Sequence, residues 1–394
     1  MIHTRQGSST LFVVSQIVFV VLGASLFVAS SQPSISQTEI PELRNQPLDI
    51  KLQYDVPQVV TDEQLLSVMY KLRPQFTHAQ PKINFVDHAL RCWGTKAQFN
   101  LDDCLSGEQM LGMLTDHKQF TAAWGEETAP LLYYKKHGLD VRMASGAATA
   151  SHVDHTLSTL AEIGVPLDYT LTTSQGSAKV EDLLVQSMRS FLVNQKEYEW
   201  TTVAAALYAT GSTSWTSSEG ERVTFDVLAK RIMRQPWAQG VCYGNHRLYS
   251  LALLLQIDDQ ITLFEDRATR SEVIAYLVEA TSRLIASQSE AGYWDQNWYD
   301  GSRTPEESTY SGPQGRRILA TGHALEWWAI APKEVQPPRE VVIRAGQWLV
   351  SEISNMEPES LNKSYTFLTH VGRALCLWRG KFPHEIAGII KSGN

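Results

Sequence analysis

Apolar side chains recur at helical spacing along most of the chain. Twelve segments carry an apolar residue every three or four positions, which is the pattern of a helix with one buried face. These segments are 61–72, 82–93, 106–122, 151–163, 180–195, 201–209, 224–234, 244–257, 270–288, 317–330, 339–353 and 364–378. Thr61 and Ser106 are each followed three residues later by Gln, the spacing of a helix capping box. The pattern therefore predicts an all-α protein.

The twelve predicted helices form six consecutive pairs, the organisation of helical repeat arrays. The second helices of four pairs begin alike, with His88-Ala-Leu, His155-Thr-Leu, His246-Arg-Leu and His323-Ala-Leu, and His370 has a similar place in the sixth pair. In an (α/α)6-like toroid, the second helices would form a parallel inner barrel, so these positions would meet at one mouth. We therefore expect a ring of imidazoles there. Helix N-termini at this mouth would favour an anion.

The N-terminal region contains a long stretch without charge. Residues 11–29 are long enough to span a bilayer as a helix, and nothing between Arg5 and Glu39 is ionisable. Because Arg5 and the terminal amine lie on the short side, residues 1–10 are predicted to be cytoplasmic and the rest of the chain extracytoplasmic. The alternative is a signal peptide cleaved near Val28-Ala29-Ser30, which would leave a secreted or periplasmic protein.

The segments after this stretch are expected to differ in order. Residues 30–54 are rich in Ser, Gln and Pro and predict a flexible stalk, and residues 55–394 predict the folded domain. The 43% apolar residues suffice for a large core, and a net charge of −8 without a basic run argues against duplex nucleic acid as a partner.

The four cysteines contain no CxxC pair, which excludes a zinc ribbon or a thioredoxin motif. Outside the cytoplasm a disulfide is allowed, and Cys92 and Cys104 are the nearest candidates. Four buried free thiols are the alternative, because cysteine is often buried.

Two short segments resemble terpenoid and prenyl toroid proteins. Gln288-x-x-x-Gly292-x-Trp294 resembles the Q-x-x-x-G-x-W repeat of squalene cyclases. Gly240-Val-Cys242-Tyr243 resembles the zinc-site segment of protein prenyltransferase β subunits, although Gly240 stands where that family has a zinc-binding Asp. That resemblance implies an α/α toroid over about residues 180–380, with His370 as the match to the family's late zinc-binding His.

A third segment is similar to a sugar-processing family. Gly322-His323-Ala-Leu-Glu326-Trp327 is similar to a stretch of the N-acylglucosamine 2-epimerase family. Members of that family are also α/α toroids, and the similarity implies His323 as an acid or base.

The densest polar cluster is Ser151-His152-Val-Asp154-His155. His152 and His155 are three positions apart and so share one helical face. They predict ligand contact or acid–base chemistry, or a metal site with Asp154 orienting one ring and a further ligand from another inner helix. An ordinary N-terminal helix turn is the structural alternative.

Charged partners follow several of the other histidines. His323 and Glu326 lie one turn apart and predict a proton-transfer pair, or else a structural contact. Arg91 and Arg373 stand three positions after His88 and His370, where they would bind carboxylates if they face the lumen or form packing salt bridges otherwise.

The loop after residue 288 carries aromatic side chains. Trp294, Trp298 and Tyr299 precede a segment rich in Gly, Ser and Pro that leads to Arg316. Long loops are often functional, so this one is predicted to cover the mouth and stack on a ligand. A loop packed on its own aromatics is the alternative. A Cys242–His246 nucleophile pair is a further hypothesis.

Together these observations predict a membrane-tethered extracytoplasmic toroid that binds a glycan or other anionic ligand at a His-lined mouth, with catalysis left open. The catalytic candidates are His246, His323, Glu326 and His370. The ligand-binding candidates are Arg91, His152, Asp154, His155, Trp294, Trp298 and Tyr299. No cofactor is required, and zinc is the alternative. The rival hypotheses are a non-enzymatic scaffold for an envelope or protein partner and a metal-dependent prenyl or terpenoid enzyme.

Overall fold

The computed structural model describes residues 40–76, 79–99, 101, 103–237, 239–302 and 314–390. The predicted cytoplasmic segment 1–10 and the membrane or signal segment 11–29 lie outside the described residues. Within the described ranges, no helix combines the length and the apolar character needed to cross a membrane. The described part is mostly helical, which confirms the predicted fold class at this level.

The helices lie close to the predicted segments, except for Pro358–Lys363 and Pro383–Ile390, which the periodicity did not predict. They are α2 (Asp62–Lys71), α3 (Ile83–Trp93), α4 (Gly107–Thr115), α5 (His117–Trp124), α6 (His155–Glu162), α7 (Val180–Ser190), α8 (Glu199–Leu207), α9 (Phe225–Arg234), α10 (Asn245–Ile261), α11 (Arg267–Ser287), α12 (Gln314–Ile330), α13 (Arg339–Ser354), α14 (Pro358–Lys363), α15 (Tyr365–Leu377) and α16 (Pro383–Ile390). The predicted helix 106–122 is two helices, because Asp116 ends α4 and its side chain accepts from the Lys118 amide to cap α5.

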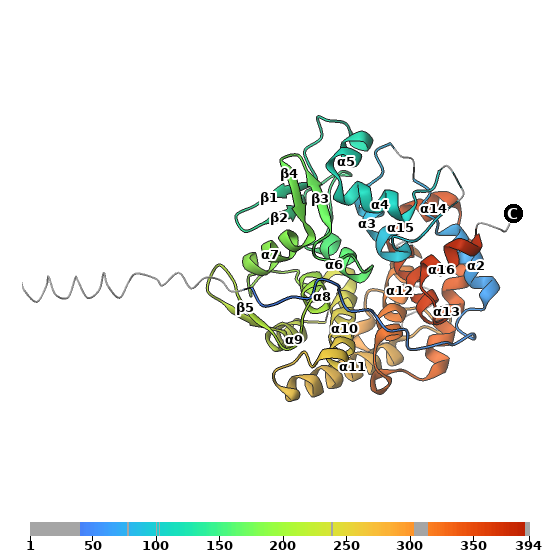
Figure 1. Cartoon of the computed structure of the whole chain (residues 1–394). Helices are drawn as coiled ribbons and strands as arrows, with labels where there is room; N and C mark the ends of the chain where they lie inside the picture. Colours follow the sequence, from blue (N-terminus) through green and yellow to red (C-terminus); the bar gives the residue numbers. More distant parts are fainter. Residues whose placement is uncertain are drawn as a thin grey trace, which may run out of the picture. The chain divides into compact units, whose positions relative to one another are not determined.

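Short elements that the periodicity did not predict complete the fold. Three 3-10 turns are η1 (Val241–Gly244), η2 (Trp298–Asp300) and η3 (Lys333–Val335). Three antiparallel hairpins pair β1 (Leu132–Tyr134) with β2 (Leu139–Val141), β3 (Thr170–Thr173) with β4 (Gly176–Lys179), and β5 (Ser214–Thr216) with β6 (Arg222–Thr224). All three hairpins contact α7 (Figure 1).

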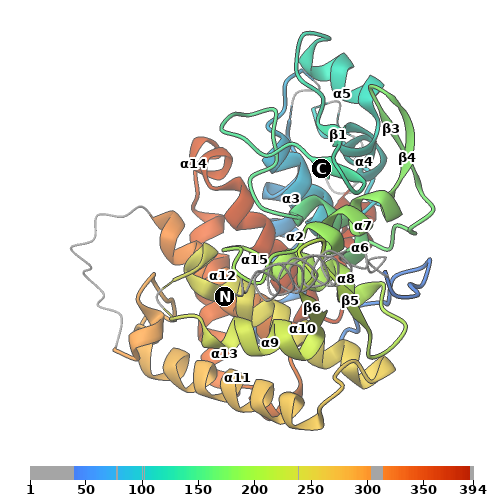
Figure 2. The same cartoon turned by 90° about the vertical axis from the view of Figure 1, so that its left-hand side faces the viewer.

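Six helices form a closed circuit of contacts. Helix α3 packs against α6, α6 against α8, α8 against α10, α10 against α12, α12 against α15, and α15 returns to α3. Helices α2, α4, α7, α9, α11 and α13 pack against this circuit (Figure 2). Every residue of α8 and residues 245–258 of α10 are buried, whereas α11 is exposed along much of its length. The circuit helices therefore form the core and the others cover it.

An extended strap at residues 43–56 crosses one end of this circuit (Figure 1, dark blue). Its backbone N–H groups donate to carbonyls just at or beyond helix C-termini, from Arg44 to Tyr208 O at 2.9 Å and from Val56 to Trp378 O at 2.8 Å. The Tyr54 hydroxyl donates to Ala331 O at 2.6 Å. Carbonyls at helix C-termini lack partners within the helix, so the strap satisfies groups that the circuit leaves open.

The prediction of a flexible stalk is wrong for the residues that form the strap. Residues 30–54 were expected to be flexible because Ser, Gln and Pro dominate them, but residues 40–54 belong to the compact unit that begins at Ile40. Leu43 and Leu48 pack against the hydrophobic core. The amino-acid composition did not indicate that this segment is ordered, because its hydrogen-bond partners lie more than 150 residues away in sequence.

Gln256 is expected to hold the centre of the strap. Its side-chain oxygen accepts from the Lys51 amide at 2.7 Å, and its Nε2 donates to Lys51 O at 3.1 Å. Replacing Gln256 by Ala should lower the free energy of unfolding by about 1–3 kcal/mol, because both Lys51 backbone groups and the buried Ile330 carbonyl lose a hydrogen bond to this side chain. Urea unfolding measures this loss, and hydrogen exchange of the Lys51 amide should accelerate. Unchanged exchange at Lys51 would contradict the assignment.

The Gln288-Gly292-Trp294 motif forms a structural clasp at the end of α11. The Gln288 Nε2 donates to Gly292 O and to Val341 O, both at 2.9 Å, and the Trp294 indole N–H donates to Leu284 O at 2.7 Å. Gly292 has a φ of 108°, and a Cβ there would lie 2.6 Å from the Arg344 carbonyl oxygen. The motif therefore joins α11 to α13 through a turn that only glycine fits.

The cysteine alternatives are also resolved. All four cysteines are free thiols, and Cys92, Cys104 and Cys376 are buried. Of the two alternatives left open, the free thiols are the one that the structure shows, and Cys92 and Cys104 do not form a disulfide. Cys92 lies inside the buried α3 helix and Cys104 in the loop that follows it, so closeness in sequence did not bring the two sulfurs together.

Candidate functional site

Six histidines lie together at the centre of the helical circuit. We call His88, His152, His155, His246, His323 and His370 the histidine chamber. Going from His88 through His155, His152, His246, His323 and His370 and back to His88, successive ring centroids are 3.8–5.9 Å apart. The rings of His88, His155, His246, His323 and His370, which the repeat predicted to converge, therefore do so, and His152 joins them. Helix α8, which lacks the His-x-Leu start, contributes Trp200, whose ring lies 4.7 Å from that of His155 and 4.8 Å from that of His246.

The chamber is almost closed to solvent. All its histidines except His152 are at most 4% exposed, and the His152 side chain is 19% exposed. Burial, and then the neighbouring imidazoles, hold the pKa values of His88 and His246 well below the usual range for histidine. The pKa of His323 is lowered in the same way, first by burial and then by His370. These three rings are therefore neutral near pH 7.

Two of the rings have their tautomer fixed by backbone carbonyls. His88 Nδ1 lies 2.8 Å from Asn84 O, and His323 Nδ1 lies 2.8 Å from Leu319 O. A carbonyl oxygen only accepts hydrogen bonds, so Nδ1 must carry the proton in both rings. Their Nε2 atoms are left as lone-pair acceptors.

Three other rings are anchored through Nδ1 by carboxylates. The pairs are His152 with Glu197 at 2.8 Å, His155 with Asp87 at 3.0 Å and His370 with Glu326 at 2.6 Å. Burial acts to raise the pKa of Glu326, but Arg91, His370 and Arg373 together hold it well below its usual range. An ionised carboxylate also only accepts, so Nδ1 is the protonated nitrogen facing the carboxylate in these pairs, and Nε2 offers a lone pair in the neutral form of each ring.

His246 completes the pattern differently. Its Nε2 lies 3.2 Å from His323 Nε2, and its buried Nδ1 has no hydrogen-bond partner among the described residues. Backbone carbonyls or carboxylates hold Nδ1 as the donor in His88, His155, His323 and His370, and His152 Nδ1 lies within ion-pair distance of Glu197, so the neutral rings present acceptor Nε2 atoms. This arrangement favours a cation or a hydrogen-bond donor, in contrast to the anion expected from the helix N-termini.

A charged layer lies one helical turn beyond the chamber. Arg91, Tyr249, Glu326 and Arg373 each stand three residues after a chamber histidine, so α3, α10, α12 and α15 run in the same direction. Arg91 binds Glu326 at 2.7 Å and Glu162 at 3.2 Å, and Arg373 binds the same two carboxylates at 2.9 and 2.8 Å. The two arginines and two glutamates balance in charge and are all buried.

Arg91 was predicted to bind a ligand carboxylate, and the structure gives it protein carboxylates instead. Glu162 supplies one of them and also accepts from the Tyr249 hydroxyl at 2.9 Å. Arg91 and Arg373 border a cavity of about 520 Å³ at the strap end of the circuit, together with Lys51 and Lys96. Both arginines nonetheless direct hydrogen bonds to the two glutamates, so their main role here is internal charge balance.

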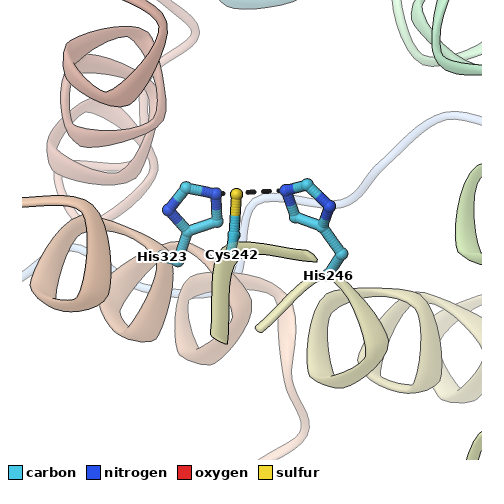
Figure 3. A group of neighbouring side chains, drawn as sticks. All are labelled: Cys242, His246 and His323. Carbon is cyan, nitrogen blue, oxygen red and sulfur yellow. Dashed lines mark hydrogen bonds between the residues drawn. The ribbon is translucent and has the colours of Figure 1, made fainter. Parts of the chain in front are cut away.

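The turn before α10 carries Cys242 to the edge of the chamber. Cys242 and Tyr243 have φ values of 51° and 58°, a conformation that is costly for residues with a Cβ. The Asn245 side-chain amide donates to Cys242 O, and the Trp298 indole N–H donates to Tyr243 O, both at 3.0 Å. These two bonds hold the turn so that the Cys242 sulfur lies beside His246 and His323 (Figure 3).

A polar cavity of about 260 Å³ borders the chamber at His152 and His155. Its wall is formed by the β1–β2 hairpin, the start of α6 and the inner side of α7. Lys135, Asp140, Asp154, Gln186 and Ser187 are among the lining residues. The lining combines hydroxyl, amide and charged groups, which suits a small polar ligand.

Asp154 faces this cavity rather than the imidazoles. It accepts from the Ser187 hydroxyl at 2.5 Å and from the Thr201 hydroxyl, and its backbone has a φ of 54°. Burial raises its pKa, against the effect of these two hydrogen bonds. The expectation that Asp154 orients a histidine is therefore wrong, since Asp87 orients His155 and Glu197 orients His152.

The predicted aromatic ligand contacts are mostly core residues. Trp294 is fully buried and packs against Trp328 at 5.6 Å between ring centroids. Trp298 is 1% exposed and packs against Trp237 at 5.9 Å. Tyr299 is half-buried. Trp294 and Trp298 therefore have no free face for a ligand. The loop's alternative interpretation, packing on its own aromatics, fits them better, and residues 303–313 lie outside the described part.

Several site residues were missed by sequence reasoning. Asp87 precedes His88, and Glu197 lies in an irregular loop, so neither carried a spacing signal toward its histidine. Glu162 stands at the end of α6, seven residues after His155, and faces the charged layer. His88 did carry the His-x-Leu signal but was not chosen as a site residue.

With this geometry described, the chain was compared with known proteins. No protein-family model, curated protein or solved structure matches it.

Proposed function

We propose that the domain is an (α/α)6 toroid whose histidine chamber and adjoining polar cavity form the active site of an acid–base enzyme acting on a small polar ligand. The closed circuit of six helices, each backed by an outer helix, supports the toroid. The convergence of histidines from five circuit helices supports a single site at its mouth.

The observation that carries the proposed activity is the His155–Asp87 pair at the edge of the cavity. Asp87 accepts from Thr156 at 2.7 Å and from Thr159 at 2.8 Å as well as from His155. Burial acts to raise the pKa of Asp87, but His155 and the two hydroxyls lower it below its usual value. The carboxylate thus accepts from His155 Nδ1, and Nε2, which has no hydrogen-bond partner among the described residues, is the nitrogen that would act on a ligand. A base oriented by a third group is the usual arrangement for proton transfer.

The His152–Glu197 pair adds a second oriented imidazole to the same cavity. His152 lies in the turn before α6 and is the most exposed ring of the chamber. Because it borders the cavity together with His155, the two rings can serve one ligand as base and acid. Proton transfer of this kind contributes about 10²–10⁴-fold to a rate.

The size and polarity of the cavity support a ligand of the glycan class. Its volume of about 260 Å³ is at the small end for ligand sites, and hydroxyl and amide groups line it. An isoprenoid chain would need a longer apolar cleft. We retain the proposal that residues 11–29 tether the domain outside the cytoplasm or serve as its signal peptide.

The hypothesis of a non-enzymatic scaffold does not account for the two imidazole–carboxylate pairs that border one cavity. A non-enzymatic toroid has no use for oriented bases side by side, whereas an enzyme needs at least two groups within the width of one substrate. The enzyme hypothesis is therefore preferred.

Asp87→Asn is expected to separate catalysis from binding. A panel of neutral and acidic mono- and disaccharides is first screened for binding by saturation-transfer NMR. Turnover of any binder is then followed in D₂O, where proton abstraction from carbon exchanges the C–H signal and bond cleavage creates new reducing ends. Asp87→Asn should lower turnover at least about a hundredfold and leave the dissociation constant within a few-fold, because it removes only the orienting carboxylate.

The control is His117→Ala, which changes a histidine at the start of α5, outside the chamber. This variant should behave as wild type. If no sugar of the panel binds, or if Asp87→Asn and His155→Ala both turn over at the wild-type rate, the proposed function is wrong.

A further inference from the structure

The side of the chamber away from the polar cavity contains a sulfur and two imidazole nitrogens close together. The ligand atoms of Cys242, His246 and His323 all lie within 4.8 Å of one another (Figure 3). They come from the turn before α10, from α10 itself and from α12. We propose that these three residues bind one transition-metal ion of the zinc class. The site uses none of the residues of the proposed catalytic pairs and does not rest on that function.

The separation of the two nitrogens fits a shared ion. His246 Nε2 and His323 Nε2 are 3.2 Å apart. Two nitrogens bound to one tetrahedral zinc at 2.0–2.1 Å lie about 3.3–3.4 Å apart. The fold therefore holds the two rings close to the spacing that coordination requires.

The protonation of His323 supports the same interpretation. Its Nδ1 proton is donated to Leu319 O at 2.8 Å, so its Nε2 lone pair points toward His246. A metal-binding histidine typically donates its other ring N–H to a carbonyl or carboxylate in this way. A hydrogen bond between the rings is the competing explanation. It would put the His246 proton on Nε2, and because the buried His246 Nδ1 has no partner among the described residues in either arrangement, that atom does not separate the two explanations.

The position of Cys242 favours the metal over that hydrogen bond. Two consecutive residues with positive φ hold its sulfur beside the rings, and such strained conformations concentrate at functional sites. A hydrogen bond between two imidazoles needs no third group. A thiolate beside two imidazoles forms a soft donor set that suits zinc, cobalt(II) or copper.

The donor set leaves a fourth position open. The His370 ring lies 3.8 Å from that of His323, but its ligand atoms group with His323 and Glu326 rather than with Cys242. Three protein ligands with one open position are the usual composition of catalytic zinc sites, whose fourth ligand is water or substrate. Binding requires the Cys242 thiol to lose its proton to solvent, so one proton is released for each ion bound.

Cobalt(II) binding tests the site directly. The purified full-length protein is treated with a chelator, dialysed and titrated with Co²⁺, which a thiolate ligand marks with a near-ultraviolet charge-transfer band. We expect one equivalent of Co²⁺ with this band, displaced by Zn²⁺. Cys242→Ser should abolish the band, and His323→Gln should weaken Co²⁺ binding at least about tenfold, the lower end of the loss seen even for second-shell changes.

The matched control is Cys376→Ser, which removes a buried thiol from α15 away from the three donors. It should keep both the band and the affinity. Circular dichroism confirms that each variant is folded. The site is refuted if folded wild type takes up no Co²⁺, if its complex lacks the thiolate band, or if Cys242→Ser retains the band. The cobalt titration of wild type does not depend on the sugar screen or on Asp87→Asn, so the two proposals are tested separately.

Discussion

Replacing Glu326 by Gln is expected to lower the free energy of unfolding by about 3–5 kcal/mol, the range for removing one partner from a buried ion pair. Glu326 accepts from both Arg91 and Arg373 and from His370, and none of these side chains is more than 6% exposed. The substitution leaves two buried guanidinium groups with Glu162 as their remaining carboxylate. The layer then carries an uncompensated positive charge on side chains that are almost fully buried.

Chemical denaturation of Glu326→Gln measures the loss. The double variant Glu326→Gln with Arg373→Met restores the charge balance, and it should be more stable than the sum of the two single changes predicts. Glu359→Gln breaks an exposed pair with Lys363 on α14 and should change stability little. A small loss in Glu326→Gln, equal to that of Glu359→Gln, would show that the buried layer does not depend on charge balance.

Trp294→Ala should cost about 3–5 kcal/mol of unfolding free energy, the range for a large aromatic residue removed from a core. The indole is fully buried, packs on Trp328 and donates to Leu284 O at 2.7 Å. Its removal leaves a cavity and an unpaired carbonyl at the end of α11. We expect unfolding at clearly lower urea concentration, with any ligand binding retained in the fraction that stays folded.

Trp124→Ala provides the comparison, because Trp124 ends α5 and is only half-buried. Its loss should be clearly smaller than that of Trp294. If Trp294→Ala left stability unchanged and abolished sugar binding instead, the residue would be a ligand contact after all.

Local patterns predicted the helices well because their signal is local. Apolar periodicity placed the circuit helices to within a few residues, except that α6 begins at His155 rather than near residue 151. The two capping boxes at Thr61 and Ser106 form as expected. Elements without such periodicity were missed, above all the strap, whose hydrogen bonds go to helix ends distant in sequence.

The imidazoles could be anticipated because the repeat places them at equivalent positions. A histidine at the same place in five helices of one circuit must face the same region if those helices are arranged alike. The partners of these histidines could not be anticipated. Asp87 reaches His155 from the neighbouring helix α3, and Glu197 reaches His152 from a loop. Leu319 O reaches His323 from within the same helix. The sequence carries no signal that links these partners to their histidines.

The periodic positions of side chains were enough to predict which helices form and that their histidines converge. What those histidines do for one another depends on the three-dimensional packing. Ring tautomers, charge balance and the approach of the Cys242 sulfur depend on distances between atoms far apart in the chain. The aromatic residues show the same division: the sequence marks Trp294 and Trp298 as prominent, but only packing determines that their faces are occupied by other side chains.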